Sequence, residues 1–431
     1  MKSKLNQITF AIASTVIIAL NAQAQLFTPG NLAILRVGDG TQILTNTGNT
    51  VFIDQYGVDG SFVNTTNLPD SGTNALIIGS ATSDGGLTRS MDRSELVVFG
   101  YNTNRVGGAS SSIANATATS VPRAIATVGA SGEYKLVQTI TNFFSGNNAR
   151  CAVSDGTNDF WLSGTVNGTV YFNPPSAGAT VQSGVANTRY IKIANGNLFF
   201  STQAGTLGIY TLTKTPGTND PAGLPATSTG ITTNLLFATG SSSQPVAFEI
   251  NPSLTVVYVA DGRSSAGGIQ KWTNNVPDST NWGLAYTLSA GTGGGTSSGT
   301  FGVAVDFNGA NAIIYATTTE AASNRLVRIV DSGSTAAATM LAASGSNRSF
   351  RGLDFTPEPG TIMPASLSIQ QSGTNAIISW PAAATGYTLQ GSTDLSQANG
   401  WSTAGTPTLS NGSNIFTVPL TNSAQFFRLK Q

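Results

Sequence analysis

The 431-residue sequence contains no histidine. Without an imidazole, the chain is unable to build a Ser-His-Asp or Cys-His nucleophile system, and most zinc sites are excluded as well. Any acid–base chemistry would have to use Asp, Glu, Lys or Tyr side chains instead.

Cysteine is almost as scarce, since Cys151 is the single one in the chain. No intramolecular disulfide is therefore available, and the fold has to be stabilised by its apolar core. Cys151 lies in a strand-like run, where we expect it to be a small buried apolar residue.

Charge and helix-forming residues are also in short supply. Asp, Glu, Lys and Arg make up only 9% of the chain, with 20 acidic and 20 basic residues in balance. No basic patch stands out, so nucleic acid is not an expected partner. No window has the period of an amphipathic helix, while the 49 glycines indicate tight turns. The composition predicts an all-β protein of short strands.

The N-terminus has the layout of a secretory signal peptide. Lys2 and Lys4 precede an apolar stretch over residues 8–20, and Ala22-Gln23-Ala24 supplies a small-residue cleavage site. We predict a signal peptide over residues 1–24 and no transmembrane segment in the mature chain, since no later apolar run is long enough. The exported protein would be periplasmic, attached to the cell surface or extracellular.

A repeat runs through the middle of the chain. Residues 246–260 align without a gap to residues 303–317, at an offset of 57 (306 minus 249). Each copy is a short alternating strand, a polar turn and a second apolar strand, followed by a third strand. Weaker copies lie on both sides, and Asn-Gly and Asp-Gly turns separate several of their strands.

These units predict a β-propeller over residues 25–357. Seven blades would give roughly 47 residues each, and six or eight blades are also compatible with the blurred early repeats. Ring closure would leave few open sheet edges. The strand at residues 32–35 is expected to complete the last blade.

Residues 246–272 resemble an NHL-type propeller blade, with the pattern apolar-Ala-apolar-acid, a turn, Tyr-Val-Ala-Asp and Gly-Ile-x-Lys-Trp. The middle region is similar to uncharacterised exported bacterial propeller proteins. This resemblance implies a fold and almost nothing about function, because propellers host many unrelated activities.

A second module is expected after a Pro- and Gly-rich linker at residues 358–362. Residues 363–431 show the order strand, Trp, turn, Tyr, strand, which resembles a fibronectin type III or immunoglobulin-like β-sandwich. Such a module would space, dock or bind.

Three acids are candidates for an axial site: Glu249, Asp306 and Asp354. They occupy matching places in the repeats, where Lys192 is the equivalent residue of an earlier unit. No cofactor motif is present, but clustered carboxylates suit calcium or an acid–base pair. Lactonase-like propellers, which this blade type resembles, hold an axial metal. The alternative is that the acids cap turns or pair with basic residues, and Lys192 favours this interpretation.

Two further sets of residues attract attention. Trp161, Trp272 and Trp282 are candidate ligand-binding residues that would stack on sugar rings, or else they pack between blades. Five arginines near the starts of repeat strands suggest a ladder of hydrogen bonds between blades: Arg89, Arg123, Arg150, Arg189 and Arg351. Asp84-Gly85-Gly86 is interpreted as a turn.

Two classes of function remain open at this point. The first is an exported, non-catalytic binding or scaffold protein whose partner is an extracellular polysaccharide or protein. The alternative is an extracellular carbohydrate-active or metal-dependent lactonase-like hydrolase that uses the axial carboxylates, since glycoside hydrolysis needs only two of them.

Overall fold

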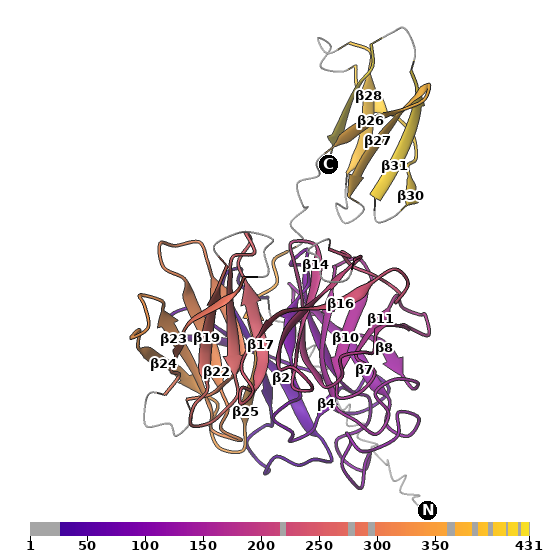
Figure 1. The fold of residues 1–431 in the computed structure, drawn as a ribbon. Helices are drawn as coiled ribbons and strands as arrows, with labels where there is room; N and C mark the ends of the chain where they lie inside the picture. The colour runs from indigo at the N-terminus through magenta and orange to yellow at the C-terminus, as the bar shows by residue number, and fades with distance from the viewer. Residues whose placement is uncertain are drawn as a thin grey trace, which may run out of the picture.

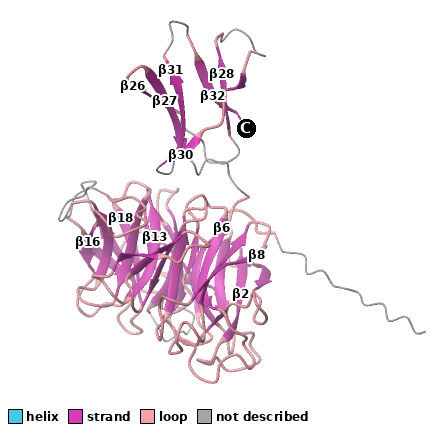
Figure 2. Cartoon of the chain, turned by 90° about the vertical axis from the view of Figure 1, so that its right-hand side faces the viewer, coloured by secondary structure: helices cyan, strands magenta, loops and turns pink. Residues whose placement is uncertain are grey.

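The computed structural model describes residues 26–215, 221–274, 281–291, 298–359, 367–381, 387–394, 400–410, 413–420 and 424–430. The predicted signal peptide and residues 360–362 of the predicted linker lie outside this part of the chain. Every regular element in the described part is a β-strand, joined by loops (Figure 2). The search of these residues also finds no helix long and apolar enough to span a membrane. The all-β prediction is confirmed.

All of the first 25 strands except β4 form six four-stranded antiparallel units, which we call blades 1 to 6. Seven blades were favoured from repeat length, but the described sheets give six, one of the alternatives. From inner to outer strand, blade 1 contains β25 (Ser349–Phe355), β1 (Leu32–Val37), β2 (Asn49–Tyr56) and β3 (Phe62–Asn67). Blade 2 contains β5 (Leu87–Arg89), β6 (Glu95–Tyr101), β7 (Arg123–Gly129) and β8 (Tyr134–Ile140). Blade 3 contains β9 (Ala149–Ser154), β10 (Phe160–Gly164), β11 (Thr169–Phe172) and β12 (Ala179–Gln182).

The later blades follow the same plan. Blade 4 contains β13 (Thr188–Ala194), β14 (Asn197–Thr202), β15 (Gly208–Thr213) and β16 (Thr232–Ala238). Blade 5 contains β17 (Pro245–Ile250), β18 (Val256–Asp261), β19 (Gly268–Thr273) and β20 (Gly283–Leu288). Blade 6 contains β21 (Thr300–Asp306), β22 (Ile313–Thr318), β23 (Arg325–Val330) and β24 (Ala338–Ala343). The short strand β4 (Ile77–Ile78) bridges β2 and β6. The two best repeats therefore become blades 5 and 6, as expected.

The blades close into a ring around an axis (Figure 1). Their innermost strands contact one another in the cyclic order β25, β5, β9, β13, β17, β21 and back to β25. The N-terminal strand β1 lies between β2 and the late strand β25 within blade 1, so both ends of the propeller meet in one sheet. The strand predicted at residues 32–35 does complete a blade, and it ties the ring shut.

Five of the six inner strands carry a β-bulge near their starts. We call residues that occupy the same place relative to these bulges a level, since they lie at the same height along the axis. Three levels matter below. The bulge level holds Arg150, Arg189, Val246, Phe301 and Arg351; the next level holds Cys151, Tyr190, Ala247, Gly302 and Gly352; and the mouth level holds Val153, Lys192, Glu249, Ala304 and Asp354.

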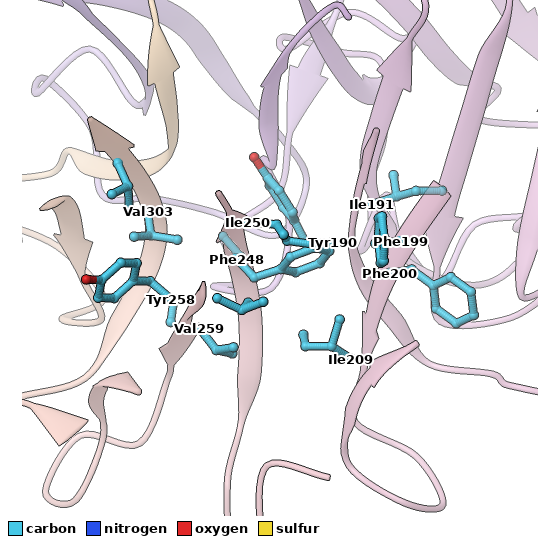
Figure 3. Packing of buried hydrophobic residues seen from close by; sticks show 14 of the residues in the cluster. Tyr190, Ile191, Phe199, Phe200, Ile209, Phe248, Ile250, Tyr258, Val259 and Val303 are labelled. Carbon is cyan, nitrogen blue, oxygen red and sulfur yellow. The ribbon is translucent and has the colours of Figure 1, made fainter. Parts of the chain in front are cut away.

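Tyr190 fills the axis at the middle level, where its equivalents are small residues. Its hydroxyl donates to the Leu87 carbonyl oxygen of β5 at 2.7 Å, two blades away, and its ring packs edge-on to Phe248 at 5.9 Å between centroids (Figure 3). Both side chains are buried. Cys151 is buried at the same level, where burial raises the pKa of its thiol to about 12, as expected of an inert core residue. The axis is thus divided into two separate ends.

The chain beyond residue 367 forms two further small sheets. One contains β26 (Ser368–Ser372), β27 (Asn375–Pro381), β31 (Ser413–Pro419) and β30 (Thr408–Ser410); the other contains β29 (Ser402–Thr403), β28 (Thr388–Ser392) and β32 (Phe426–Lys430). Ile378, Trp380 and Leu389 form their own buried cluster between these sheets. The strands predicted around Trp380 and Tyr387 are present, and the fibronectin-like identity of the module stays a prediction.

Candidate functional site at the axial mouth

Three charged side chains converge at one end of the axis, which we call the axial mouth. Lys192 of β13 forms an ion pair with Glu249 of the neighbouring β17, and its Nζ lies 3.5 Å from the Asp354 Oδ2 of β25, across the axis. The sequence predicted this convergence from the repeat offset. Side chains from three separate strands meet here because the bulges place them at the same level.

Asp306 does not join this group, contrary to expectation. The repeat offset placed it level with Glu249, but Glu249 pairs with Tyr258 while the equivalent Tyr315 pairs with Ala304. Asp306 therefore lies two residues farther along its strand, and its Oδ1 caps a turn by accepting the Asn308 backbone N–H at 2.9 Å. A gapless sequence alignment misses this shift, since pairing register is set between strands.

Arg89 and Glu358 complete the wall of the mouth. The Arg89 backbone N–H donates to Asp354 Oδ2 at 2.9 Å, while its guanidinium donates to Glu358 Oε1 at 3.2 Å. Glu358 belongs to the segment that follows β25, so residues of the predicted linker lie against the site. Sequence reasoning noted Arg89 only as a ladder residue and missed Glu358, because nothing local signals that a linker residue reaches the axis.

These side chains line an open hollow of about 500 Å³. Polar groups that carry no charge share its wall: Ser90, Asn195, Asn251 and Asn308. A hollow of this size accommodates a small polar ligand.

The environment drives the pKa values of the two paired acids apart. Burial raises the pKa of Glu249 from 4.5 to about 7; Lys192 opposes this rise and the charge of Asp354 adds to it. Burial also acts to raise the pKa of Asp354, but Lys192 and Arg89 outweigh it and hold that pKa below its usual value. Near neutral pH the mouth thus has one ionised acid and one that exchanges its proton.

A calcium ion does not fit these contacts. Lys192 lies between Glu249 and Asp354, and its ammonium takes the place that a cation would need. Across the described residues, no group of three His, Cys, Asp or Glu side chains gathers closely enough to hold a metal ion. The contacts favour charge compensation by Lys192, the alternative raised from the sequence.

The three tryptophans lie away from the mouth. Trp161 and Trp272 are buried; the Trp161 indole N–H donates to the Pro225 carbonyl oxygen at 2.8 Å, and Trp272 stacks on Phe237 at 4.5 Å. Trp282 is partly exposed and lines a small hollow of about 80 Å³. Packing therefore accounts for the first two rings, and sugar stacking stays a prediction for Trp282.

The arginine ladder is present in part. Arg123 donates to the Val121 and Ala114 carbonyl oxygens of the loop before β7, at 2.7 and 2.9 Å, and to the Asn147 carbonyl oxygen just before β9, at 2.8 Å. Arg150 donates to the Thr188 carbonyl oxygen of β13 at 3.0 Å. Asp84, interpreted as a turn residue, does close a turn, because its backbone N–H donates to the Ala81 carbonyl oxygen at 3.2 Å. Its side chain is buried just before β5.

No family model matches this chain, and no curated protein matches it either. Solved structures with a similar fold include the periplasmic gluconolactonase of Pseudomonas aeruginosa, at 10% identity and a TM-score of 0.41, covering 92% of this chain and 99% of that one. A gluconolactonase from Xanthomonas campestris gives 12% identity, a TM-score of 0.39 and coverage of 81% and 93%. A protein from Lactobacillus plantarum gives 11% identity, a TM-score of 0.42 and coverage of 89% and 99%. Likenesses this remote do not extend to a site or an activity.

Proposed function

We propose that the axial mouth hydrolyses the lactone or a similar cyclic ester of a sugar acid, without a metal. One observation carries this proposal: Lys192 joins Glu249 and Asp354 at the wall of an open, polar hollow. A base with a pKa near the working pH, next to a fixed cation, is the pair that ester hydrolysis needs.

The roles follow from the charges. Ionised Glu249 takes a proton from a water molecule as the water oxygen attacks the carbonyl carbon. The Lys192 ammonium stabilises the negative charge that develops on the carbonyl oxygen. Glu249 then returns the proton to the ring oxygen as the C–O bond breaks, which yields the open hydroxy acid. Asp354 stays ionised and holds Lys192 in its charged form, since both acids raise the pKa of that lysine.

The same cation argues against glycoside hydrolysis at this site. The transition state of that reaction resembles an oxocarbenium ion and carries positive charge at the reacting carbon. Lys192 would repel this charge, whereas it attracts the oxyanion of ester hydrolysis.

The wall of the hollow indicates the substrate class. Ser90, Asn195, Asn251 and Asn308 offer hydroxyl and amide groups of the kind that bond sugar hydroxyls. Arg93, which is 60% exposed at its side chain, adds a positive charge at the rim. The gluconolactonases named above are too remote to support this activity, so the proposal stands on the mouth itself. Export to the periplasm or beyond remains a prediction from the N-terminal sequence.

The test is hydrolysis of glucono-δ-lactone, followed by pH-stat against the uncatalysed rate. We expect Glu249→Gln to lower kcat/KM by about 10²- to 10⁴-fold, because it removes the general base. The rate should also rise with pH through about 7, as Glu249 loses its proton.

Asp306→Asn is the matched control, since this acid lines the same hollow but caps its own turn. It should keep most of the activity. Equal rates for the wild type and Glu249→Gln would overturn the proposal. Lactone binding without turnover would instead support the second candidate, a non-catalytic sugar-binding protein, which the pairing of both acids with Lys192 also permits.

A further inference from the structure

The other end of the axis holds a group of arginines that the proposed activity does not use. Arg150, Arg189 and Arg351 occupy the bulge level of β9, β13 and β25. The segment just before β5 lies between Arg351 and Arg150 and carries glycines instead: the Gly85 carbonyl oxygen accepts the Gly352 N–H, and the Gly86 N–H donates to the Arg150 carbonyl oxygen, at 2.9 Å each. We call the three arginines the arginine arc, since they lie on blades 1, 3 and 4, with only blade 2 between the first two of them.

The arginine arc has fewer partners than its donors require. Arg150 donates to Asn187 Oδ1 at 2.6 Å and the Thr188 carbonyl oxygen at 3.0 Å, and Arg351 donates to the Ser80 carbonyl oxygen at 3.2 Å. Arg189 makes no hydrogen bond or ion pair within the described part of the chain. The Nε atoms of all three are buried without a partner. Buried guanidinium donors of this kind are costly unless an acceptor reaches them.

One acid lies near enough for its charge to act on all three arginines. This acid is Asp84. Its carboxyl group accepts hydrogen bonds from the Tyr101 hydroxyl, the Asn148 side-chain amide and the Ser83 hydroxyl, at 3.1 Å each. No arginine donates to it within the described residues. Three arginines thus share one nearby acid, and burial raises the pKa of that acid, which favours its neutral form. Burial, followed by repulsion from Arg150, lowers the pKa of Arg189 to about 9.

We propose that the arginine arc binds a small oxyanion of the phosphate class. Guanidinium groups present paired N–H donors that match the oxygens of such an anion, and several of them converge here from three blades. An anion would satisfy the open donors and offset the excess positive charge. This site is separate from the axial mouth, because the buried ring of Tyr190 fills the axis between the two levels.

The experiment is isothermal titration of the mature chain with inorganic phosphate, in buffer of constant ionic strength set with chloride. We expect a single saturable site and a thermal midpoint that rises by about 5 °C at saturation. Arg189→Gln should weaken phosphate binding by about tenfold or more, since it removes one charge-assisted partner. In phosphate-free buffer this variant should be at least as stable as the wild type, because the charge it removes is unpaired.

Two matched Arg→Gln controls locate the site. Arg105→Gln removes a charge that is already paired with Asp70 at 2.7 Å on the outer part of the molecule, and Arg89→Gln removes one at the axial mouth. Both should bind phosphate like the wild type. The proposal is overturned if phosphate gives no heat and no thermal shift, if chloride alone stabilises equally, or if Arg89→Gln loses binding while Arg189→Gln keeps it.

Discussion

At the scale of single residues, Lys192 decides what the mouth acids do. It contacts both Glu249 and Asp354, yet these two carboxyl groups differ in pKa because Asp354 has two additional backbone donors and Arg89 beside it. One acid is therefore kept as a counterion, and the other exchanges a proton near neutral pH. The equivalent alanine in blade 6, Ala304, keeps a third acid out of the group.

Glu249 should make the stability of the protein depend on pH. Its folded pKa of about 7 lies above the 4.5 of the unfolded chain, so the native state holds the proton more tightly. The unfolded state releases its proton first as pH rises, and the free energy of unfolding falls between pH 4.5 and 7. We expect this group to lower that free energy by about 3 kcal/mol, and urea denaturation at several pH values measures it.

Glu249→Gln should lack this fall, whereas Asp306→Asn should keep it. The free energies of unfolding of the wild type and Glu249→Gln are plotted against pH. If the two curves run parallel from pH 4.5 to 7, the pKa of Glu249 is not raised.

At the scale of elements, two inner strands, β21 and β25, closely approach the next inner strand because a glycine follows their bulges. A Cβ atom on Gly352 would stand 2.2 Å from the Leu87 backbone nitrogen of β5. One on Gly302 would stand 2.7 Å from the Arg351 carbonyl oxygen of β25. Since backbone atoms of the neighbouring strand are in the way, no side-chain rotation relieves such contacts.

Gly352→Ala should therefore push β25 away from β5, because the added Cβ would stand against the Leu87 backbone. We expect a loss of about 3 kcal/mol in the free energy of unfolding, from overpacking that forces a backbone shift. Gly283→Ala is the control, because no atom lies within 4 Å of its added Cβ. It should change stability by less than about 0.5 kcal/mol. Equal urea midpoints for the two variants would contradict this account.

At the scale of the whole molecule, one strand joins the two ends of the propeller. β1 pairs with β2 on one side and β25 on the other, and its apolar side chains are buried. The last two sheets, by contrast, have their own buried cluster, with no member shared with the four clusters of the blades.

Two truncations should therefore behave differently. A chain that begins at residue 38 lacks β1, leaves β2 and β25 without their partner, and should lose its cooperative thermal transition. A chain that ends at residue 359 should keep the main transition within about 2 °C, because no blade loses a strand. Calorimetry of both chains tests this, and a cooperative transition without β1 would show that the ring does not need its closing strand.

The sequence by itself determined the all-β class, the repeated strands, the closing strand and the meeting of Lys192, Glu249 and Asp354, because hydrophobic alternation and turn residues act locally and recur at a fixed offset. Only the tertiary structure decided the number of blades, the exclusion of Asp306, the approach of Glu358 to the mouth and the gathering of the arginine arc. Each of these depends on register, on bulges or on ring closure. Such features are set by pairing between strands distant in the sequence, and a one-dimensional pattern does not record them.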